Sequence, residues 1–241
     1  MKLSRVHPTP VEIIDIEDEG SRDRLLEWYT PPTRNWLRIN LVTSVSGSAV
    51  GTDGTSNTLT SGTDRRILGV IRELSDVVLV GAQSVRVEGY QLPRRARLAI
   101  VTGSGNFDGH RFSPEDAARI TVVCPPRVAD TVRVSLPGAE VLVAEAEAGH
   151  LAPASIIAEL RAAGYASIVC EGGPSLASSL LAGGLVDELC LTTSPVLSDS
   201  TTAAFVGDGL GTHSLDLHQL LVDDASYLFA RWQVRETPAT R

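Results

Sequence analysis

Short apolar runs and amphipathic segments alternate along most of the chain. The runs WLRINLVT, DVVLVGA, ARLAIVTG, RITVVC and YASIVC are typical of buried strands. Between them, residues 61–74 repeat apolar side chains at helical spacing, and PASIIAELRAAG (153–164) does the same. PSLASSLLAGG (174–184) has proline in its first turn and glycines after its end, which also predicts a helix. Strands that alternate with helices predict a largely parallel sheet with helices on both faces.

Further segments in the middle and at both ends of the chain add to this predicted sheet. DTVRVSL and AEVLVAEA predict short strands in the middle of the chain, and VDELCLTTSPVL and SYLFARWQVRE predict closing strands. Because no helix is predicted between the closing strands, we expect an antiparallel edge on a mixed sheet. Residues 1–33, with a strand VEIIDI and a helix over 21–29, are predicted to be an N-terminal extension, and residues 34–241 a single domain. The predicted fold class is therefore α/β, in three layers.

Composition narrows the class of protein. The 241 residues are 43% hydrophobic and 21% charged, with a net charge of −8, which disfavours a nucleic-acid-binding role. The three cysteines lie in apolar runs without metal-ligand or disulfide spacing, so we expect buried thiols and no metal. The N-terminus lacks a signal-peptide core, and no apolar run reaches the length of a membrane span. A cytoplasmic protein is expected.

Glycines end three of the predicted strands, at Gly81, at Gly103 and Gly105, and at Gly172 and Gly173. The last pair leads directly into a helix, and bare amides at a helix N-terminus suit a phosphate. Because ligands of open α/β sheets bind at the carboxyl ends of the strands, we expect a phosphorylated ligand there, most economically a dinucleotide. The alternative is that each glycine only serves its turn. The sequence contains neither a G-x-G-x-x-G fingerprint after the first strand nor a P-loop.

Several motifs, taken in order, carry a resemblance to a known family. They are LRINLVTSVSG, DGTSNTLTSGTDRRILGVIRELSDVVLVGAQSVRVEGY, AIVTGSG, IVCEGGPSLASSLLAGGLVDELCLTTSPVL and YLFARWQV. Over residues 36–235 the chain resembles the riboflavin-biosynthesis pyrimidine reductases, which also form the reductase half of the bifunctional riboflavin deaminase-reductase. The zinc-deaminase signatures of the other half are absent from the sequence. The resemblance implies a dihydrofolate reductase-like fold, a homodimer, and NADPH-dependent hydride transfer to the ribosyl carbon of a phosphoribosylamino-pyrimidine.

The resemblance also implies roles for individual residues. The cofactor-binding positions are Val42, Thr58, Gly81, Ser84, Glu88, Thr102, Gly103, Ser104, Gly172, Gly173, Pro174, Ser175 and Leu176. The substrate-binding positions are Ser44, Ser56, Arg72 and Glu171, with Glu171 also a catalytic candidate. From the residues alone, a surface residue of an amphipathic helix is the favoured interpretation of Arg72. For Glu171, an acid that serves the helix dipole is as good an interpretation as the functional one.

One departure from the family pattern concerns the first loop. The family has S-L-D-G there, whereas this chain has SVSG, so Ser46 occupies the place of the catalytic aspartate. A serine hydroxyl donates and accepts hydrogen bonds but supplies no carboxylate for proton transfer.

Three functions therefore stay open. The first is the pyrimidine reductase itself, and the second a dihydrofolate reductase-like pterin reductase, against which the retained Ser56 and Arg72 count. The third is a catalytically impaired NADPH-binding sensor or scaffold, which the loss of the acid at Ser46 motivates.

Overall fold

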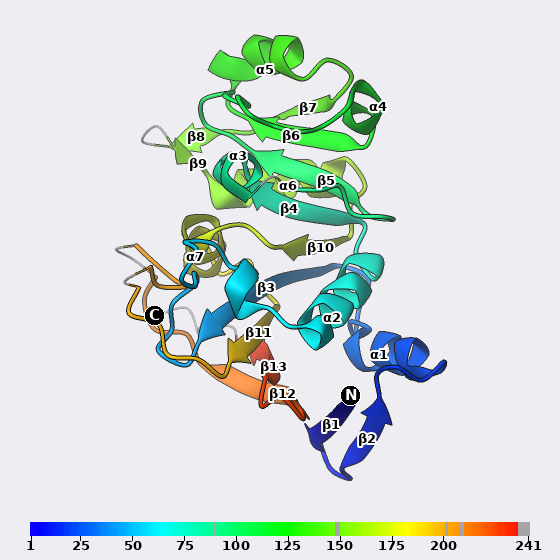
Figure 1. Cartoon of the computed structure of the whole chain (residues 1–241). Coiled ribbons are helices and arrows are strands. Elements are labelled where there is room, and N and C mark those ends of the chain that lie inside the picture. Colours follow the sequence, from blue (N-terminus) through cyan, green and yellow to red (C-terminus); the bar gives the residue numbers. More distant parts are fainter. Residues whose placement is uncertain (89, 148–149, 201, 208–209, 236–241) are drawn as a thin grey trace.

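A computed structural model describes residues 1–88, 90–147, 150–200, 202–207 and 210–235. Its centre is an 11-stranded sheet in the order β2-β1-β12-β13-β11-β3-β10-β4-β5-β6-β7 (Figure 1). The strands are β1 (Lys2–His7), β2 (Glu12–Asp15), β3 (Trp36–Ser44), β4 (Val77–Gly81), β5 (Arg97–Val101), β6 (Ile120–Cys124), β7 (Glu140–Val143), β10 (Ser167–Cys170), β11 (Glu188–Ser194), β12 (Leu215–Asp223) and β13 (Leu228–Val234). β8 (Ala146–Glu147) and β9 (His150–Leu151) pair separately.

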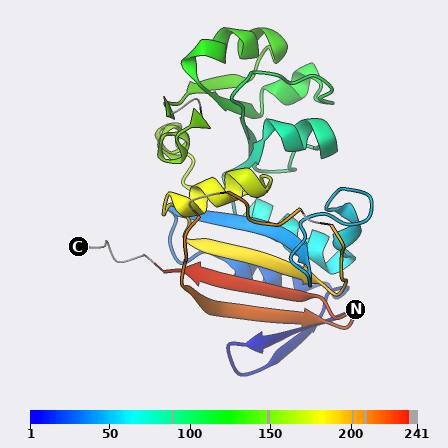
Figure 2. The ribbon, with the colours of Figure 1, turned by 90° about the vertical axis from the view of Figure 1, so that its left-hand side faces the viewer.

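The strands from β11 to β7 are parallel, and β13, β12, β1 and β2 are antiparallel to their neighbours. Figure 2 shows β3, β11, β13 and β12 side by side at the mixed end of the sheet. The prediction of a mixed, largely parallel sheet with an antiparallel edge is confirmed.

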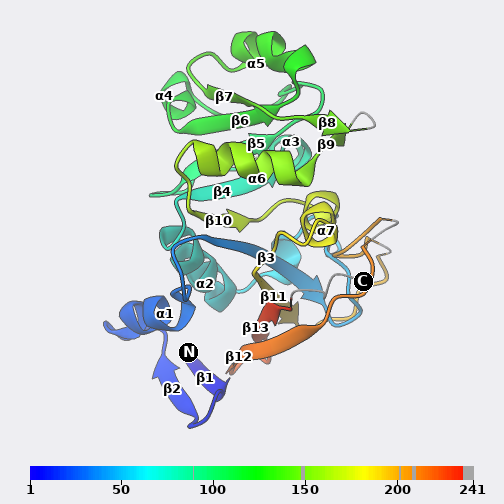
Figure 3. The ribbon, with the colours of Figure 1, turned by 180° about the vertical axis from the view of Figure 1, so that it is seen from behind.

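Helices cover both faces of the sheet. α1 (Ser21–Tyr29), α2 (Gly62–Glu73), α3 (Ala82–Glu88), α4 (Pro114–Ala117) and α5 (Ala129–Ser135) lie on one face, and α6 (Pro153–Ala162) and α7 (Pro174–Ala182) on the other (Figures 1 and 3). Each face has its own apolar core, because alternate residues of the buried strands point to opposite sides. Val78 and Val80 of β4 face α2, for example, whereas Val77 and Leu79 face α6 and α7. Within the described residues, no helix is both long and apolar enough to span a membrane.

One predicted strand is wrong. DTVRVSL forms most of helix α5 instead of a strand. The alternation of Val132 and Val134 suggested period two, yet Val134 is 82% exposed. The buried residues are Ala129, Val132 and Leu136, which recur at helical spacing.

The predicted N-terminal helix coincides with α1, and VEIIDI contains β2. β1, which the sequence pattern did not predict, pairs with β12 and continues the sheet into the first residues of the chain. α1 packs against α2 on the same face as the candidate site described below. The first 33 residues thus contribute two strands and a helix to the layers formed by the rest of the chain. The boundary at residue 34 stays a prediction.

A buried ion cluster replaces apolar packing beneath α1. Glu188 on β11 accepts hydrogen bonds from Arg38 Nε on β3 and Arg231 Nε on β13, both at 2.5 Å, and from Trp36 Nε1 at 3.0 Å. The side chains of Glu188, Arg38 and Arg231 are each less than 5% exposed.

The two guanidiniums of this cluster also donate to the last carbonyls of α1. Arg38 Nη2 reaches Tyr29 O at 2.8 Å, and Arg231 Nη1 reaches Trp28 O. The negative end of the helix dipole therefore offsets part of the second positive charge. The two arginines lower the pKa of Glu188 against the opposing effect of burial.

Glu188→Gln removes the anion while leaving two buried guanidiniums. Unpairing a buried charge typically costs about 3–5 kcal/mol, so we expect urea unfolding to show a loss of about that size. Glu27→Gln is a matched control, because Glu27 is 65% exposed and pairs with Arg24 on the surface of α1. That variant should lose less than about 1 kcal/mol. Equal losses in the two variants would contradict a central role for the cluster.

Candidate active site

A cavity of about 390 Å³ opens at the carboxyl ends of β3 and β10. Its walls come from β3, the loop that follows it, the α2 helix, and the turn between β10 and α7. Among its lining residues are Asn40, Val42, Ser56, Asp64, Arg65, Arg72, Ser84, Tyr90, Glu171, Gly172, Gly173 and Pro174. The topology explains this placement, because parallel neighbouring strands end at the same edge of the sheet.

Arg72 and Glu171 form the charged wall of the cavity. They come from α2 and from the residue after β10, 99 positions apart, and pair through Nε to Oε1 at 2.8 Å and Nη2 to Oε2 at 2.6 Å. Tyr90 closes the arrangement: its hydroxyl donates to Glu171 Oε2 at 2.5 Å and accepts from Arg72 Nη2 at 2.7 Å. Burial and the negative charge of Glu171 raise the pKa of Tyr90 well above its usual value, so the hydroxyl stays protonated. The structure thus brings together two of the four predicted substrate-binding residues, Arg72 and Glu171, and adds Tyr90.

Asp64 is the functional candidate that sequence reasoning missed. Asp64 is an acidic residue in the first turn of α2, and its backbone N–H donates to the Ser61 side chain at 3.1 Å, so its sequence position suggests only a role at the helix end. Asp64 is, however, also among the residues that line the cavity, and its carboxyl group accepts a hydrogen bond from Thr192 Oγ1 of β11 at 2.7 Å. Asp64 is 7% exposed, and burial raises its pKa. A carboxyl group with a raised pKa is better suited to proton donation than an ordinary one.

The turn from β10 to α7 fits the phosphate groups of a dinucleotide. Gly173 precedes α7, whose first turn contains proline and no acidic residue, so its free amides face no competing carboxylate. A Cβ on Gly173 would lie 3.7 Å from Ser84 Oγ, which places the α3 serine beside this turn. Ser175 and Leu176 continue into the helix, and a Cβ on Gly172 would lie 2.7 Å from Leu176 Cδ2. A side chain at position 172 would therefore collide with Leu176, so the turn requires glycine there.

The remaining predicted cofactor positions spread along the same edge of the sheet. Gly81 ends β4, and Thr102, Gly103 and Ser104 follow β5. Thr102 Oγ1 accepts from Gly105 N at 3.0 Å and so shapes this turn. Thr58 bonds instead to Asp53 in its own loop, at 3.1 Å. The side chain of Glu88 lies outside the described part of the structure.

The Ser46 side chain is bound to the segment that follows β11. Its hydroxyl donates to Ser198 O at 2.9 Å, accepts from Ser198 N at 3.0 Å, and lies 2.9 Å from Ser44 Oγ. Ser44 in turn accepts from Ser48 N at 3.0 Å. The two serines thus tie the first loop to the segment after β11, and neither is among the residues that line the cavity.

Comparison with known families gives a match to the RibD C-terminal domain over residues 35–228. The chain belongs to this family. Members of the RibD C-terminal family are NADPH-dependent reductases with a dihydrofolate reductase-like fold, and the α/β architecture described above agrees with that fold. No curated protein sequence matches the chain.

Solved structures support the assignment to the RibD C-terminal family. A pyrimidine reductase-like protein from Corynebacterium diphtheriae is 26% identical, with a TM-score of 0.75 over 90% of this chain and 99% of that protein. The riboflavin biosynthesis reductase Rib7 of Saccharomyces cerevisiae has a TM-score of 0.69 at 14% identity, over 90% of this chain and 100% of the yeast protein. A Thermotoga maritima deaminase/reductase has a TM-score of 0.67 at 18% identity, over 88% of this chain but 60% of its own length. The last two likenesses concern the fold alone.

Asp64→Asn should make the stability of the folded protein less dependent on pH. Because the folded-state pKa of Asp64 is raised, the wild type loses stability as pH rises from the unfolded-state pKa of about 4 through the folded-state value. Asparagine keeps the neutral shape and the acceptor for Thr192. We expect the variant to unfold at a higher temperature than the wild type at pH 7, and this difference to shrink towards pH 4.

Differential scanning calorimetry at both pH values measures this effect, with Asp108→Asn as the control at an exposed loop position. A variant that is less stable than the wild type at pH 7 would show that the ionised Asp64 is favourable, contrary to the arrangement of the cavity.

Proposed function

We propose that the protein is an NADPH-dependent reductase of an aminopyrimidine heterocycle, with the pyrimidine intermediate of riboflavin biosynthesis as the leading substrate. When bound, NADPH supplies the hydride. The observation that carries the proposal is the convergence of Glu171, Arg72 and Ser56 on the same cavity as the Gly172–Pro174 turn. A sugar-phosphate group is recognised by such a set, since a guanidinium forks onto phosphate oxygens and a carboxylate accepts sugar hydroxyls.

Each chain residue has a defined task in this proposal. Gly172, Gly173 and Ser84 hold the cofactor phosphates, and the side chains of Val42 and Asn40 bound the space for the rings. Glu171 orients the ribosyl group, and Tyr90 fixes the direction of its carboxylate through the 2.5 Å hydrogen bond. Asp64 donates a proton within the cavity, the part that the family assigns to the acid replaced by Ser46 in this chain.

A second candidate is the reduction of a dihydropterin. The Asp64–Thr192 pair favours it, because a protonatable carboxyl group next to a hydroxyl matches the paired donors and acceptors of a 2-aminopyrimidine edge. The retained Arg72 and Ser56 favour the first candidate. Both reactions use the same cofactor and the same cavity, so a direct comparison of substrates distinguishes them.

The test follows the absorbance of NADPH at saturating cofactor with each substrate. The leading proposal expects oxidation with the ribosylaminopyrimidine phosphate, and Arg72→Gln should then raise KM at least about tenfold, as expected for loss of a charge-assisted pair. Asp64→Asn should lower kcat by about a hundredfold, the usual contribution of a general acid.

The controls use the same assay. Arg133→Gln, at an exposed pair on α5, should behave as wild type. Oxidation with dihydropterin alone would move the assignment to the second candidate. Cofactor binding without oxidation by either heterocycle would favour a sensor or scaffold.

A further proposal concerns Ser46→Asp. If Asp64 supplies the proton, an acid in the first loop adds nothing, and the variant loses the hydrogen bonds that Ser46 forms with Ser198. We expect kcat at or below the wild-type value in the same assay. A clear rise in kcat would instead show that the family acid acts from the loop.

We also propose a homodimer, as the family resemblance implies, which light scattering after size-exclusion chromatography tests.

A further inference from the structure

One segment after β11 connects the two halves of the candidate site. We call its described residues, 195–200 and 202–207, the strap, and they run beside α7 (Figures 1 and 3). The strap also contacts the first loop, which leaves β3 at Ser44 and continues to Val50. Both segments form part of the cavity wall, through Ala49, Val50 and Thr202.

Several hydrogen bonds attach the strap to the first loop. Val45 N donates to Val196 O at 2.9 Å, and Ala49 N donates to Thr202 O at 2.8 Å. The pair of hydrogen bonds between Ser46 and the strap lies between these two points. The first loop can leave the strap only by breaking these bonds together, so its position depends on that of the strap.

Ser178 of α7 holds the other end of the strap. Its Oγ accepts a hydrogen bond from Val206 N at 2.8 Å, and the residue is 4% exposed. A serine within a helix commonly bonds to a carbonyl of its own helix, as the neighbouring Ser179 does with Leu176 O at 2.9 Å. Ser178 joins α7 to a backbone N–H 28 residues further along the chain.

The two attachments lie close together along the strap. Ala204 N donates to Gly47 O of the first loop at 3.2 Å, two residues before the amide that Ser178 binds. Two residues of extended chain span at most about 7 Å, so the strap has little slack between these points. Ala204 is 5% exposed, and Phe205 packs against the apolar core on the α6 and α7 face of the sheet. A shift of α7 is therefore transmitted to the first loop.

We propose that Ser178 is a positioning residue that couples the start of α7 to the first loop through the strap. When a dinucleotide phosphate binds the Gly172–Pro174 turn, the strap holds the first loop, and with it the cavity wall at Ala49, in place. Cofactor binding and attachment of the strap then favour each other, since coupling between two sites is reciprocal. Ser46 fastens the strap and takes no part in proton transfer. The response to the cofactor rests on the function proposed above, whereas the connection between Ser178 and the first loop does not.

Hydrogen–deuterium exchange of the protein without ligand tests this connection. The amides of Val45 and Ala49 report it, because both donate to the strap. Ser178→Ala removes the acceptor for Val206 N, so these two amides should exchange about fivefold faster, as expected for the loss of one hydrogen bond that opposes a local opening. Ser179→Ala is the matched control and should leave both rates unchanged, because the Ser179 hydroxyl bonds within its own helix.

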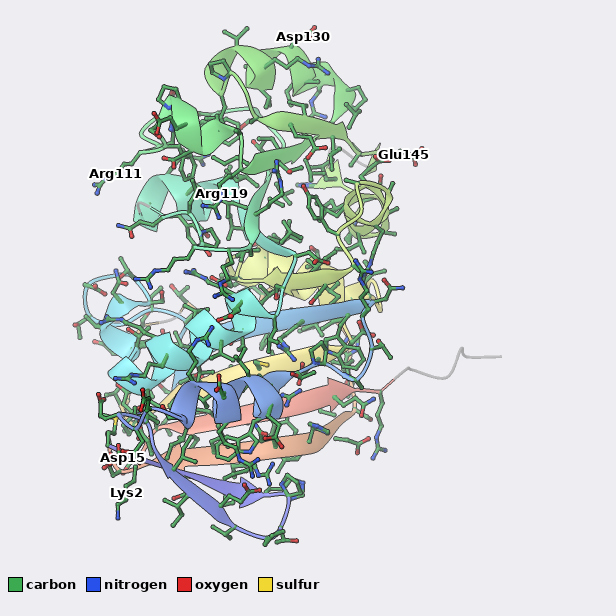
Figure 4. The ribbon with its side chains drawn as sticks, turned by 90° about the vertical axis from the view of Figure 1, so that its right-hand side faces the viewer. Lys2, Asp15, Arg111, Arg119, Asp130 and Glu145 are labelled. Carbon is green, nitrogen blue, oxygen red and sulfur yellow. The ribbon has the colours of Figure 1, made fainter. Side chains whose placement is uncertain are left out.

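Helix α5 is the remote reference in the same experiment, because Asp130 marks it at the end of the molecule opposite Asp15 (Figure 4). Faster exchange at Val45 and Ala49 with unchanged exchange in α5 supports the proposal. An equal rise in α5 would show that Ser178 only stabilises the whole fold, and unchanged rates at Val45 and Ala49 would show that the strap transmits nothing. Either result would overturn the proposal.

Ser46 provides a second pair of variants. Ser46→Ala removes both hydrogen bonds to Ser198, whereas Ser46→Thr keeps a hydroxyl group at the same position. We expect faster exchange at Val45 and Ala49 in the alanine variant and rates close to those of the wild type in the threonine variant. Equal rates in the two variants would show that the hydroxyl does not fasten the strap.

Addition of NADP⁺ tests the coupling to the cofactor. In the wild type, saturating NADP⁺ should slow exchange both in the first turn of α7 and at Val45 and Ala49. In Ser178→Ala, the first turn of α7 should still be protected, while the first loop should no longer respond. Protection of α7 alone in the wild type would overturn the coupling. Absence of any protection would overturn the proposed cofactor and the coupling together, and the measurement without ligand would still decide the role of Ser178.

Discussion

The buried carboxylate of Glu188 is the constraint on which the position of the site depends. It joins β3, β11 and β13 through Arg38 and Arg231, at the point where the sheet changes from parallel to antiparallel. Each of the three groups alone would be costly to bury, so they persist only as a set. The same guanidiniums bind the last carbonyls of α1, and this fixes the helix against the sheet.

A second set of charges organises the cavity in a different way. The Arg72 side chain is 26% exposed and that of Glu171 is 7% exposed, and both residues line the cavity. The Tyr90 hydroxyl stabilises the pair and determines which oxygen of Glu171 remains available. The fold therefore separates a fully buried ion cluster beneath α1 from a partly exposed one at the strand ends.

The sequence predicted the elements whose local pattern is strong. The apolar strands, α2, α6, α7 and the glycine turn at Gly172 were found because each is determined by neighbouring residues. β1 and β12 were missed, since KLSRVH and LDLHQLLVD lie at the less buried end of the sheet and mix polar with apolar side chains. The pairing of Asp64 with Thr192, 128 residues away, follows only from the parallel register of β3 and β11 and the tilt of α2 above them. No local pattern records such a contact.

The position of the acid illustrates why a motif and a site are different things. When the first loop is compared with the family motif, Ser46 stands where the family has an aspartate, so the loop lacks a carboxylate. In three dimensions, however, Asp64 from the first turn of α2 is among the residues that line the cavity, whereas Ser46 is not. Burial there raises the pKa of Asp64, whereas an acid in the exposed first loop would lack that protection. The proposed proton donor therefore comes from a helix rather than from the first loop, because what matters is where an acidic group lies relative to the cavity and not where it lies in the sequence.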